Sequence, residues 1–360
     1  AIPLVKQFTA IVKQQDEDAA RYVHWGATSQ DIIDTATILQ CRDALGLIEK
    51  QVQQAYQVSL DQAQQYRAQV MIGRTWLQQA LPITLGHKFA RWAAAFKRDL
   101  DRLSEMKSRV LTAQLGGAVG SLASLQDQGS AVVKAYAAAL NLTSPECTWH
   151  GERDRIVEIA SVLALIVGNV GKMAKDWSLL MQTEIAEVFE PTAKGRGGSS
   201  TMPHKRNPVA AACVLAAANR VPALMASVYQ NMLQEHERAL GTWHAEWLVI
   251  PEIFQLCAGA LERTTDVLEH MQVDAEAMQR SHQRIVSTFP ISRVYQAHIP
   301  TYAAGYWLFG FASKKYHPLD DLDAEKWQAL NLKTNYYTTR LHKGAFYLPA
   351  FLERLLEEVE

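Results

Sequence analysis

The chain has 360 residues, of which 48% are hydrophobic and 20% charged, and its formal net charge at pH 7 is -1. This length allows a large core and two or three domains. The near-zero charge gives no electrostatic reason to expect nucleic acid or an anionic membrane as a partner. No uninterrupted apolar run reaches membrane-spanning length, and the opening AIPLVKQF, which lacks an initiator Met, is no signal peptide. We therefore expect a chain that begins partway into a longer protein.

The four cysteines are far apart in the sequence and lack the spacing of metal or redox sites. They are Cys41, Cys147, Cys213 and Cys257. This usage predicts reduced thiols packed as small core residues and a cytoplasmic location.

The N-terminal part predicts a short helical stretch over residues 1–23, followed by YVHWGATSQDIIDTA from Tyr22 to Ala36. Thr28 and Ser29 precede Asp31 and an apolar helical pattern, so they are candidates to cap a helix. Read alone, this stretch is as readily a capping segment as a binding site, and the neighbouring His24 and Trp25 favour a site.

Two long helical patterns follow, over residues 34–65 and from about residue 83 to Ala113, with a break at MIGRTWLQQALP between them. Arg74 and Gln78 fall in this break, where a solvated arginine is the commoner outcome. The small residues of LGGAVGSLASLQDQG, residues 115–129, indicate a closely packed turn.

The clearest pattern runs from Ile156 to Met181, where apolar residues recur at near-heptad spacing and predict a long bundle helix. Its polar end carries Glu184, Glu187 and Glu190, for which a solvated acidic face is expected. Further helices are predicted over Val209 to about Glu237, with a kink at Pro222, and over residues 251–271. Five long striped helices predict a mainly α bundle with burial between subunits.

The stretch GRGGSSTMPHKRNPV, residues 195–209, combines three glycines with serines and basic side chains. The glycines predict a loop that can close over a ligand. Asn207 and Pro208 predict a helix start whose free amide groups attract anions. Together they indicate a site for a carboxylate or a phosphate.

Three of these stretches resemble the three sequence blocks of the fumarase/aspartase superfamily of helical homotetrameric enzymes: HWGATSQD, GRTWLQQALP and GGSSTMPHKRNP. Within it, YVHWGATSQDIIDTA, GRTWLQQALPITLGHK, TWHGERDR and WHAEW resemble the bacterial 3-carboxy-cis,cis-muconate cycloisomerases. The resemblance covers residues 1 to about 280. It implies a homotetramer with shared active sites, acting on a small tricarboxylate without metal or organic cofactor.

By this resemblance, Ser199 moves the proton at the α-carbon, while Lys205 and Asn207 bind the substrate carboxylate and stabilise charge. Several cations are needed for a tricarboxylate, because arginine can grip a carboxylate with two parallel bonds. The expected substrate-binding residues are His24, Thr28, Ser29, Arg74, Gln78, Arg153, Ser200, Met202 and Arg238. His150 and His244 are weaker candidates, with a structural role favoured.

Trp76 marks a departure from the superfamily's lyases, which carry a histidine after GRT that serves the leaving group. An intramolecular lactonisation has no separate leaving group, so Trp76 favours a cycloisomerase over an adenylosuccinate-lyase-like enzyme, the alternative within the superfamily.

The sequence of the C-terminal part does not resemble the superfamily and lacks the apolar stripes of the bundle helices. It is rich in aromatic residues, shows a period-two pattern over residues 306–311, and resembles the C-terminal part of the spermidine synthase family from about residue 288 to 355. Tyr302 and Trp307 match that family's amine-site residues, although Ala303 replaces its usual proline, and packing is the favoured role. The expected organisation is a remnant of an N-terminal helical domain (1–33), a central bundle (34–281) and an atypical α/β-like segment (282–360). An inactive composite with a polyamine-synthase-like tail is the third hypothesis.

Overall fold

The computed structural model describes residues 2–192, 197–198, 202, 205–277, 291–298, 306–350 and 353–354. These residues form two compact units. The bundle unit comprises residues 1–65, 88–183 and 188–272, and the second unit comprises residues 66–87, 184–187 and 273–360. The three segments predicted from the sequence, with boundaries at 33/34 and 281/282, stay a prediction.

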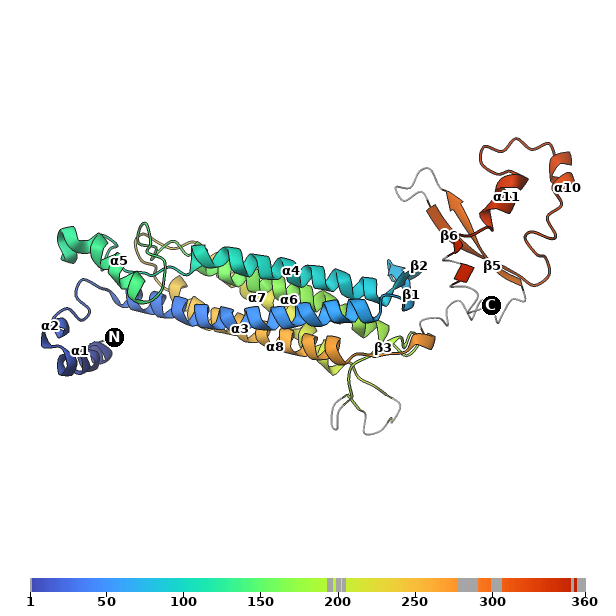
Figure 1. Cartoon of the computed structure of the whole chain (residues 1–360). Coiled ribbons are helices and arrows are strands. Elements are labelled where there is room, and N and C mark those ends of the chain that lie inside the picture. The colour runs from blue at the N-terminus through green and yellow to red at the C-terminus, as the bar shows by residue number, and fades with distance from the viewer. Residues whose placement is uncertain are drawn as a thin grey trace. The chain divides into compact units, whose positions relative to one another are not determined.

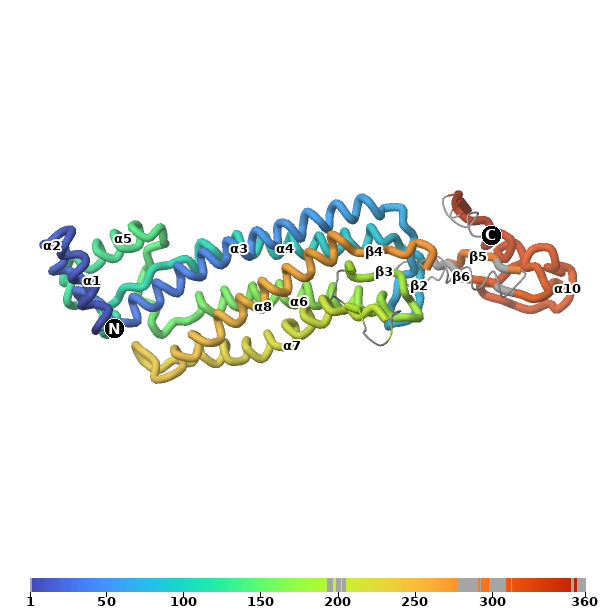
Figure 2. The backbone as a smooth tube through the Cα atoms, turned by 90° about the horizontal axis from the view of Figure 1, so that it is seen from below, coloured from blue at the N-terminus to red at the C-terminus, as the bar shows by residue number. Residues whose placement is uncertain are grey.

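Long helices running alongside one another make up the bundle unit, as Figures 1 and 2 show. They are α3 (Ser29–Gln65), α4 (Leu85–Val110), α6 (Asp154–Leu180), α7 (Val209–Gln230) and α8 (Thr242–His270). The predicted mainly α bundle is confirmed. Helices α3, α6 and α8 begin at the same end of the bundle, because Arg153, just before α6, contacts Asp34 near the start of α3 and Glu246 near the start of α8.

Helix α6 packs against both α7 and α8, which also pack against each other, and α8 contacts α3 as well. The apolar residues of α6 recur every three or four positions, which places them on the faces that turn towards neighbouring helices. The seam predicted between Ile156 and Met181 consists of twelve apolar residues, and all twelve are buried. They are Ile156, Ile159, Ala160, Leu163, Ile166, Val167, Val170, Met173, Ala174, Trp177, Leu180 and Met181. The heptad-like pattern therefore predicted both the helix and its buried face.

The ends of α7 and α8 differ from the expectation. Helix α7 stops at Gln230 rather than near Glu237, and α8 starts at Thr242, nine residues before Pro251. Pro251 lies inside α8 instead of opening it. Trp243 explains the earlier start, because its buried indole donates a 2.9 Å hydrogen bond to the Oδ1 atom of Asp34.

Two helices among the described residues, α6 and α7, are long and apolar enough to cross a membrane by length and composition. Neither contains an uninterrupted apolar run of that length, because polar residues such as Asn169 in α6 and Asn219 and Arg220 in α7 interrupt the pattern. In α6, 61% of the most apolar window is buried inside the protein, and in α7 39%. Core helices of a bundle have the same composition, because both of their sides contact apolar neighbours.

Shorter elements cover the end of the bundle at which α3 begins. They are α1 (Ile2–Gln15), α2 (Glu17–Ala20), a 3-10 turn (Ala123–Gln128) and α5 (Gly129–Ala139). Gly117 has a φ of +76°, and a Cβ atom there would lie 2.7 Å from the carbonyl oxygen of Gly26. This close approach agrees with the packed turn predicted for residues 115–129.

The second unit contains two antiparallel hairpins. Strands β1 (Val70–Thr75) and β2 (Gln78–Thr84) occupy the predicted break and are joined by the two-residue turn Trp76–Leu77. The second hairpin pairs β5 (Ile291–His298) with β6 (Tyr306–Ser313), which confirms the period-two pattern there. Helices α10 (Ala324–Ala329) and α11 (Thr339–Ala345) follow. The two-residue strand β3 (Val188–Phe189) belongs to the bundle unit, and β4 (Gln272–Val273), its pairing partner, lies where that unit ends.

Candidate active site

The third sequence block leads directly into α7. Ser199 and Ser200, the expected proton-transfer serine and its neighbour, lie outside the described residues. Around them the backbone folds back on itself: the amide of Asn207 donates a 2.8 Å hydrogen bond to the carbonyl of Gly197, and that of Lys205 a 3.0 Å bond to Met202. Lys205 and Met202 are exposed. Within the described ranges, no carboxylate forms an ion pair with Lys205, so its charge is available to a ligand.

The start of α7 differs from the predicted anion site. Asn207 does not cap the helix with its side chain, and the N-cap position is held by Pro208. The free amides are taken by the carboxylate of Glu190, which accepts 2.8 Å hydrogen bonds from Ala210 and Ala211. The same carboxylate accepts a 3.0 Å bond from the indole of Trp177. The anion at this helix start is therefore one of the protein's own side chains.

Arg206 anchors the block beside this cap. Its guanidinium donates a 3.1 Å hydrogen bond to the carbonyl of Glu190 and a 2.7 Å bond to the Oε1 atom of Gln272. It also lies over the ring of Phe189, 4.1 Å from the ring centre. Partial burial lowers the pKa of Arg206. These contacts fix the backbone between Lys205 and Asn207.

We expected the glutamates before this block to form a solvated acidic face, but two of the three are buried. Glu187 and Glu190 are 1% and 5% exposed, whereas Glu184 is exposed. Buried carboxylates need partners, and both have them. Glu187 pairs with Arg74 in the second unit, and Glu190 caps α7.

The second block lies on the β1–β2 hairpin. Arg74 donates two hydrogen bonds to the carboxylate of Glu187, of 2.6 and 2.9 Å, and one of 3.2 Å to the carbonyl of Ile72. Gln78 is exposed and stands opposite Thr75 across the turn. Arg74 is therefore no solvated loop arginine. Its bidentate bond to Glu187 would have to open before it could grip a substrate.

The first block brings two expected binding residues together. Arg238, from the segment between α7 and α8, donates a 2.8 Å hydrogen bond to the Oγ1 atom of Thr28 and a 3.3 Å bond to the Oε1 atom of Gln30. Ser29 is the first residue of α3, and His24 is half-buried with a φ of 63°. Arg238 is exposed and has no carboxylate partner within the described ranges, so it remains a candidate anion ligand.

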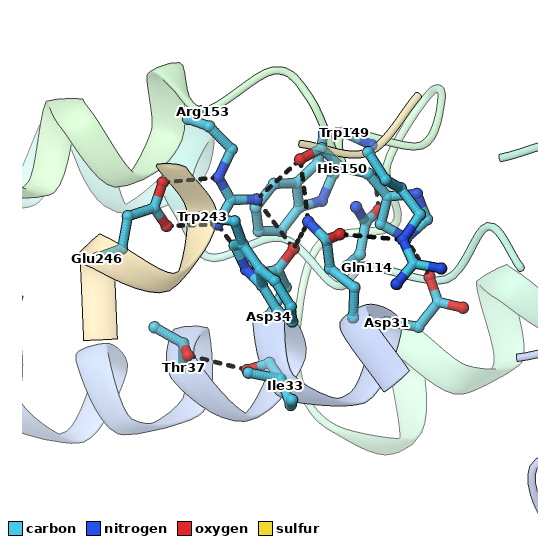
Figure 3. A network of polar contacts seen from close by, with 12 residues as sticks. Asp31, Ile33, Asp34, Thr37, Gln114, Trp149, His150, Arg153, Trp243 and Glu246 are labelled. Atoms are coloured by element: carbon cyan, nitrogen blue, oxygen red, sulfur yellow. Dashed lines mark hydrogen bonds and ion pairs between the residues drawn. The ribbon is translucent and has the colours of Figure 1, made fainter. Parts of the chain in front are cut away.

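Asp31 holds the first block in place from inside. It is completely buried, and its carboxylate accepts hydrogen bonds of 2.8 to 3.0 Å from the amides of Thr28, Gly116 and Gly117. The Nε2 atom of His150 lies 2.6 Å from its Oδ1 atom. Figure 3 shows His150 pointing into this buried network. A structural role for His150 fits its 1% exposure.

Arg153, expected to bind substrate, is 2% exposed and fully engaged by protein groups (Figure 3). It donates to Asp34 through Nη1 and Nη2, each at 2.9 Å, and to Glu246 through Nε and Nη2, at 2.9 and 2.6 Å. Burial acts to lower the pKa of Arg153, but the bonds and charges of Glu246 and Asp34 outweigh it and raise that pKa. All five N–H groups are occupied once the carbonyl of His150 is included. Arg153 thus has no N–H left for a substrate, and its role in this arrangement is structural.

The first and third blocks lie at opposite ends of α7. Lys205 and Asn207 precede its first residue, and Arg238 follows its last. A helix of 22 residues is about 33 Å long at 1.5 Å per residue. A small substrate held by Lys205 therefore cannot reach Arg238 or Thr28 of the same chain.

The bundle of long helices has the fold of solved lyases and cycloisomerases to which the chain is similar. A family model described as lyase matches residues 4–223. The chain belongs to this lyase family, part of the fumarase/aspartase superfamily.

Comparison with individual proteins shows similarity to cycloisomerases and a lactonizing enzyme. The chain is 78% identical over 288 residues to the 3-carboxy-cis,cis-muconate cycloisomerase of Acinetobacter baylyi, a match that covers 80% of this chain and 63% of the relative. The crystal structure of the β-carboxy-cis,cis-muconate cycloisomerase from Acinetobacter calcoaceticus matches with a TM-score of 0.73 at 73% identity, covering 79% of this chain and 63% of that one. The 3-carboxy-cis,cis-muconate lactonizing enzyme of Pseudomonas putida matches with a TM-score of 0.74 at 49% identity, covering 80% and 66%.

The chain thus spans less than two thirds of the length of these relatives. These comparisons do not support the expected resemblance of the C-terminal part to spermidine synthase. Tyr302 lies outside the described residues, and Trp307 lies opposite Ala297 in the β5–β6 hairpin.

Proposed function

We propose that the protein interconverts 3-carboxy-cis,cis-muconate and its carboxymuconolactone. The observation that carries this proposal is the 78% identity over 288 residues with a cycloisomerase of that name. Trp76 supports it, because the position that serves a leaving group in the superfamily's other lyases is filled by a side chain that cannot transfer a proton at neutral pH.

The proposed reaction needs one new C–O bond and one new C–H bond. One carboxylate of the muconate attacks the β-carbon of the double bond that is conjugated to another carboxylate, and the electron pair of that bond moves onto this second carboxylate as an aci-carboxylate. Lys205 and Asn207 stabilise this charge, since fixed cations and donors act most where charge develops in the transition state. Ser199 then delivers a proton to the α-carbon, and removes it in the reverse direction. The reaction requires no metal or organic cofactor.

We further propose a homotetramer in which each site combines blocks from different chains. The roughly 33 Å length of α7 supports this, because a single chain cannot present Lys205 and Arg238 to one small substrate. The turn at Trp76–Leu77 also supports it. Trp76 is 97% exposed and Leu77 76% exposed in the isolated chain, and large apolar side chains are seldom left in water without a partner surface.

A cytoplasmic location is proposed on the cysteines. All four are free, as thiols of a reducing compartment are. Cys41 and Cys257 are buried core residues as expected, whereas Cys147 and Cys213 are exposed, against the expectation.

Loss of the ultraviolet absorbance of the conjugated muconate tests the activity, with the solution mass measured on the same sample. We expect turnover by a tetramer and none after Ser199→Ala or Lys205→Met. A folded tetramer without turnover would refute the cycloisomerase, and release of fumarate from adenylosuccinate would favour the alternative lyase. A monomer would refute the shared site.

A further inference from the structure

A cleft of about 340 Å³ lies between α4 and α6 in the bundle unit. None of its lining residues belongs to the predicted active site. Trp92 and Met173 line it and are 4% and 1% exposed, so part of its wall is apolar and closely packed. Its charged lining consists of Lys88, Arg91, Arg98, Lys172 and Asp176.

The charges of this cleft do not balance. Its single carboxylate, Asp176, forms ion pairs with Lys172 and, at 4.0 Å, with Lys88. Within the described ranges, neither Arg91 nor Arg98 has a carboxylate within 4.0 Å. Arg91 and Arg98 thus bring two positive charges to the cleft that no carboxylate within 4.0 Å offsets in the described ranges, on a chain whose formal net charge is -1.

The nearest buried carboxylate does not offset this surplus by pairing with the arginines of the cleft. Asp99 follows Arg98 in α4 and is completely buried. Its oxygens accept hydrogen bonds of 2.8 and 3.0 Å from the side chain of Asn169 and one of 3.0 Å from Arg102. Asp99 thus makes its side-chain hydrogen bonds to Asn169 and Arg102, and burial raises its pKa, while the charge of Arg98 acts to lower that pKa.

Helical spacing places the basic side chains on the faces of α4 and α6 that line the cleft. Residues 88, 91, 95 and 98 are three or four positions apart and share one face of α4, and residues 169, 172, 173 and 176 share one face of α6. Arg91 and Arg98 are seven residues apart, about 10 Å along the helix. Two guanidinium groups at this separation can each grip a different oxyanion of one molecule.

We propose that this cleft binds a small, multiply charged anion, one that carries at least two carboxylate or phosphate groups. The volume is within the range of ligand pockets, and the two arginines supply planar, bidentate donors for groups of this shape. Ala94, which lines the same cleft and is exposed, provides apolar surface for the body of the molecule. The site is separate from the proposed reaction and does not depend on it.

Isothermal titration calorimetry on the full chain at low ionic strength tests the proposal, with citrate and inorganic pyrophosphate as probes. Low salt matters because exposed charges are screened within about 10 Å at 0.1 M. The cleft variant is Arg91→Gln with Arg98→Gln. The control variant, Arg67→Gln with Arg263→Gln, removes the same charge from exposed arginines outside the cleft.

We expect the wild type and the control variant to bind at least one probe, and the cleft variant to bind it at least tenfold more weakly. Binding of citrate alone would identify a polycarboxylate site, and binding of pyrophosphate alone a phosphate site. If neither probe binds, or if the cleft variant binds as tightly as the wild type, the proposal is wrong. A changed solution mass of the cleft variant without anion binding would also overturn it, because the cleft would then be a contact between copies. Muconate turnover of the wild type is measured separately, so failure of the anion site would not count against the proposed reaction.

Discussion

Replacing Arg153 with methionine tests the buried network at the start of α3, α6 and α8. The substitution keeps an unbranched side chain but leaves two carboxylates in the interior, where the side chains of Asp34 and Glu246 are 2% and 7% exposed. Asp34 keeps hydrogen bonds from Trp243, at 2.9 Å, and Gln30, at 3.2 Å. For Glu246, Arg153 supplies both observed bonds. Most of the expected loss of unfolding free energy therefore comes from Glu246.

The expected loss is about 3–5 kcal/mol of unfolding free energy at neutral pH, as for other buried pairs that lose one partner. Burial already raises the pKa of Glu246, and Arg153 acts against that rise. Without Arg153 the pKa of Glu246 rises further above its unfolded value. The folded variant then takes up a proton more readily than the unfolded chain, so the loss is greatest at pH 8 and shrinks as the pH falls towards 5.

Urea unfolding followed by circular dichroism at pH 8 and pH 5 measures this loss. Arg220→Met is the matched control, because Arg220 pairs with Glu252 on the surface and should leave stability close to that of the wild type. Adding Glu246→Gln to Arg153→Met should restore part of the stability at pH 8 and remove most of the pH dependence. A loss no larger than that of the control, or equal at both pH values, would refute the reasoning.

Three further predictions concern other parts of the chain. Ala186→Gly should raise the melting temperature by relieving a φ of 52° at a non-glycine residue, a net gain of about 0.5–1 kcal/mol after the entropy of glycine is subtracted; an unchanged or lower melting temperature would contradict it. Glu190→Ala should destabilise the protein by about 2–3 kcal/mol, because two helix amides and an indole lose a buried acceptor, whereas Glu184→Ala, at an exposed position, should not; equal unfolding curves for both variants would argue against the cap. Burial raises the pKa of Cys41 to about 12 and raises that of Cys257 as well, so neither should be alkylated at pH 8 in the folded protein while the exposed Cys147 reacts; peptide mass spectrometry showing equal rates would rule this out.

Apolar periodicity predicted the helices because the residues that define it are close in sequence. The seam of α6 is the clearest example, with all twelve positions buried. The hairpin at residues 70–84 was missed, because Trp76 and Leu77 occupy a turn in which asparagine and glycine are the usual signal.

The polar contacts were harder to predict, because their partners are far apart in the chain. Arg153 and Asp34 are separated by 119 residues, and Arg153 and Glu246 by 93. A single sequence gives no sign that these three side chains meet, so Arg153 was assigned to the substrate. Asp34 and Glu246 were missed for the same reason. The carboxylate that caps α7 was closer, since Glu190 precedes Ala210 by only 20 residues, and an acidic residue shortly before a helix without a side-chain cap is a usable signal.

The network at the bundle end has a consequence for the electric field there. Arg153 carries one positive charge against the two carboxylates of Asp34 and Glu246, so the cluster has a surplus negative charge in the interior. The first turns of α3, α6 and α8 meet at this point, and each helix dipole presents its positive end there. The three helix dipoles together stabilise the negative charge that the guanidinium of Arg153 does not neutralise. The common direction of these helices thus helps to make a buried acidic pair tolerable.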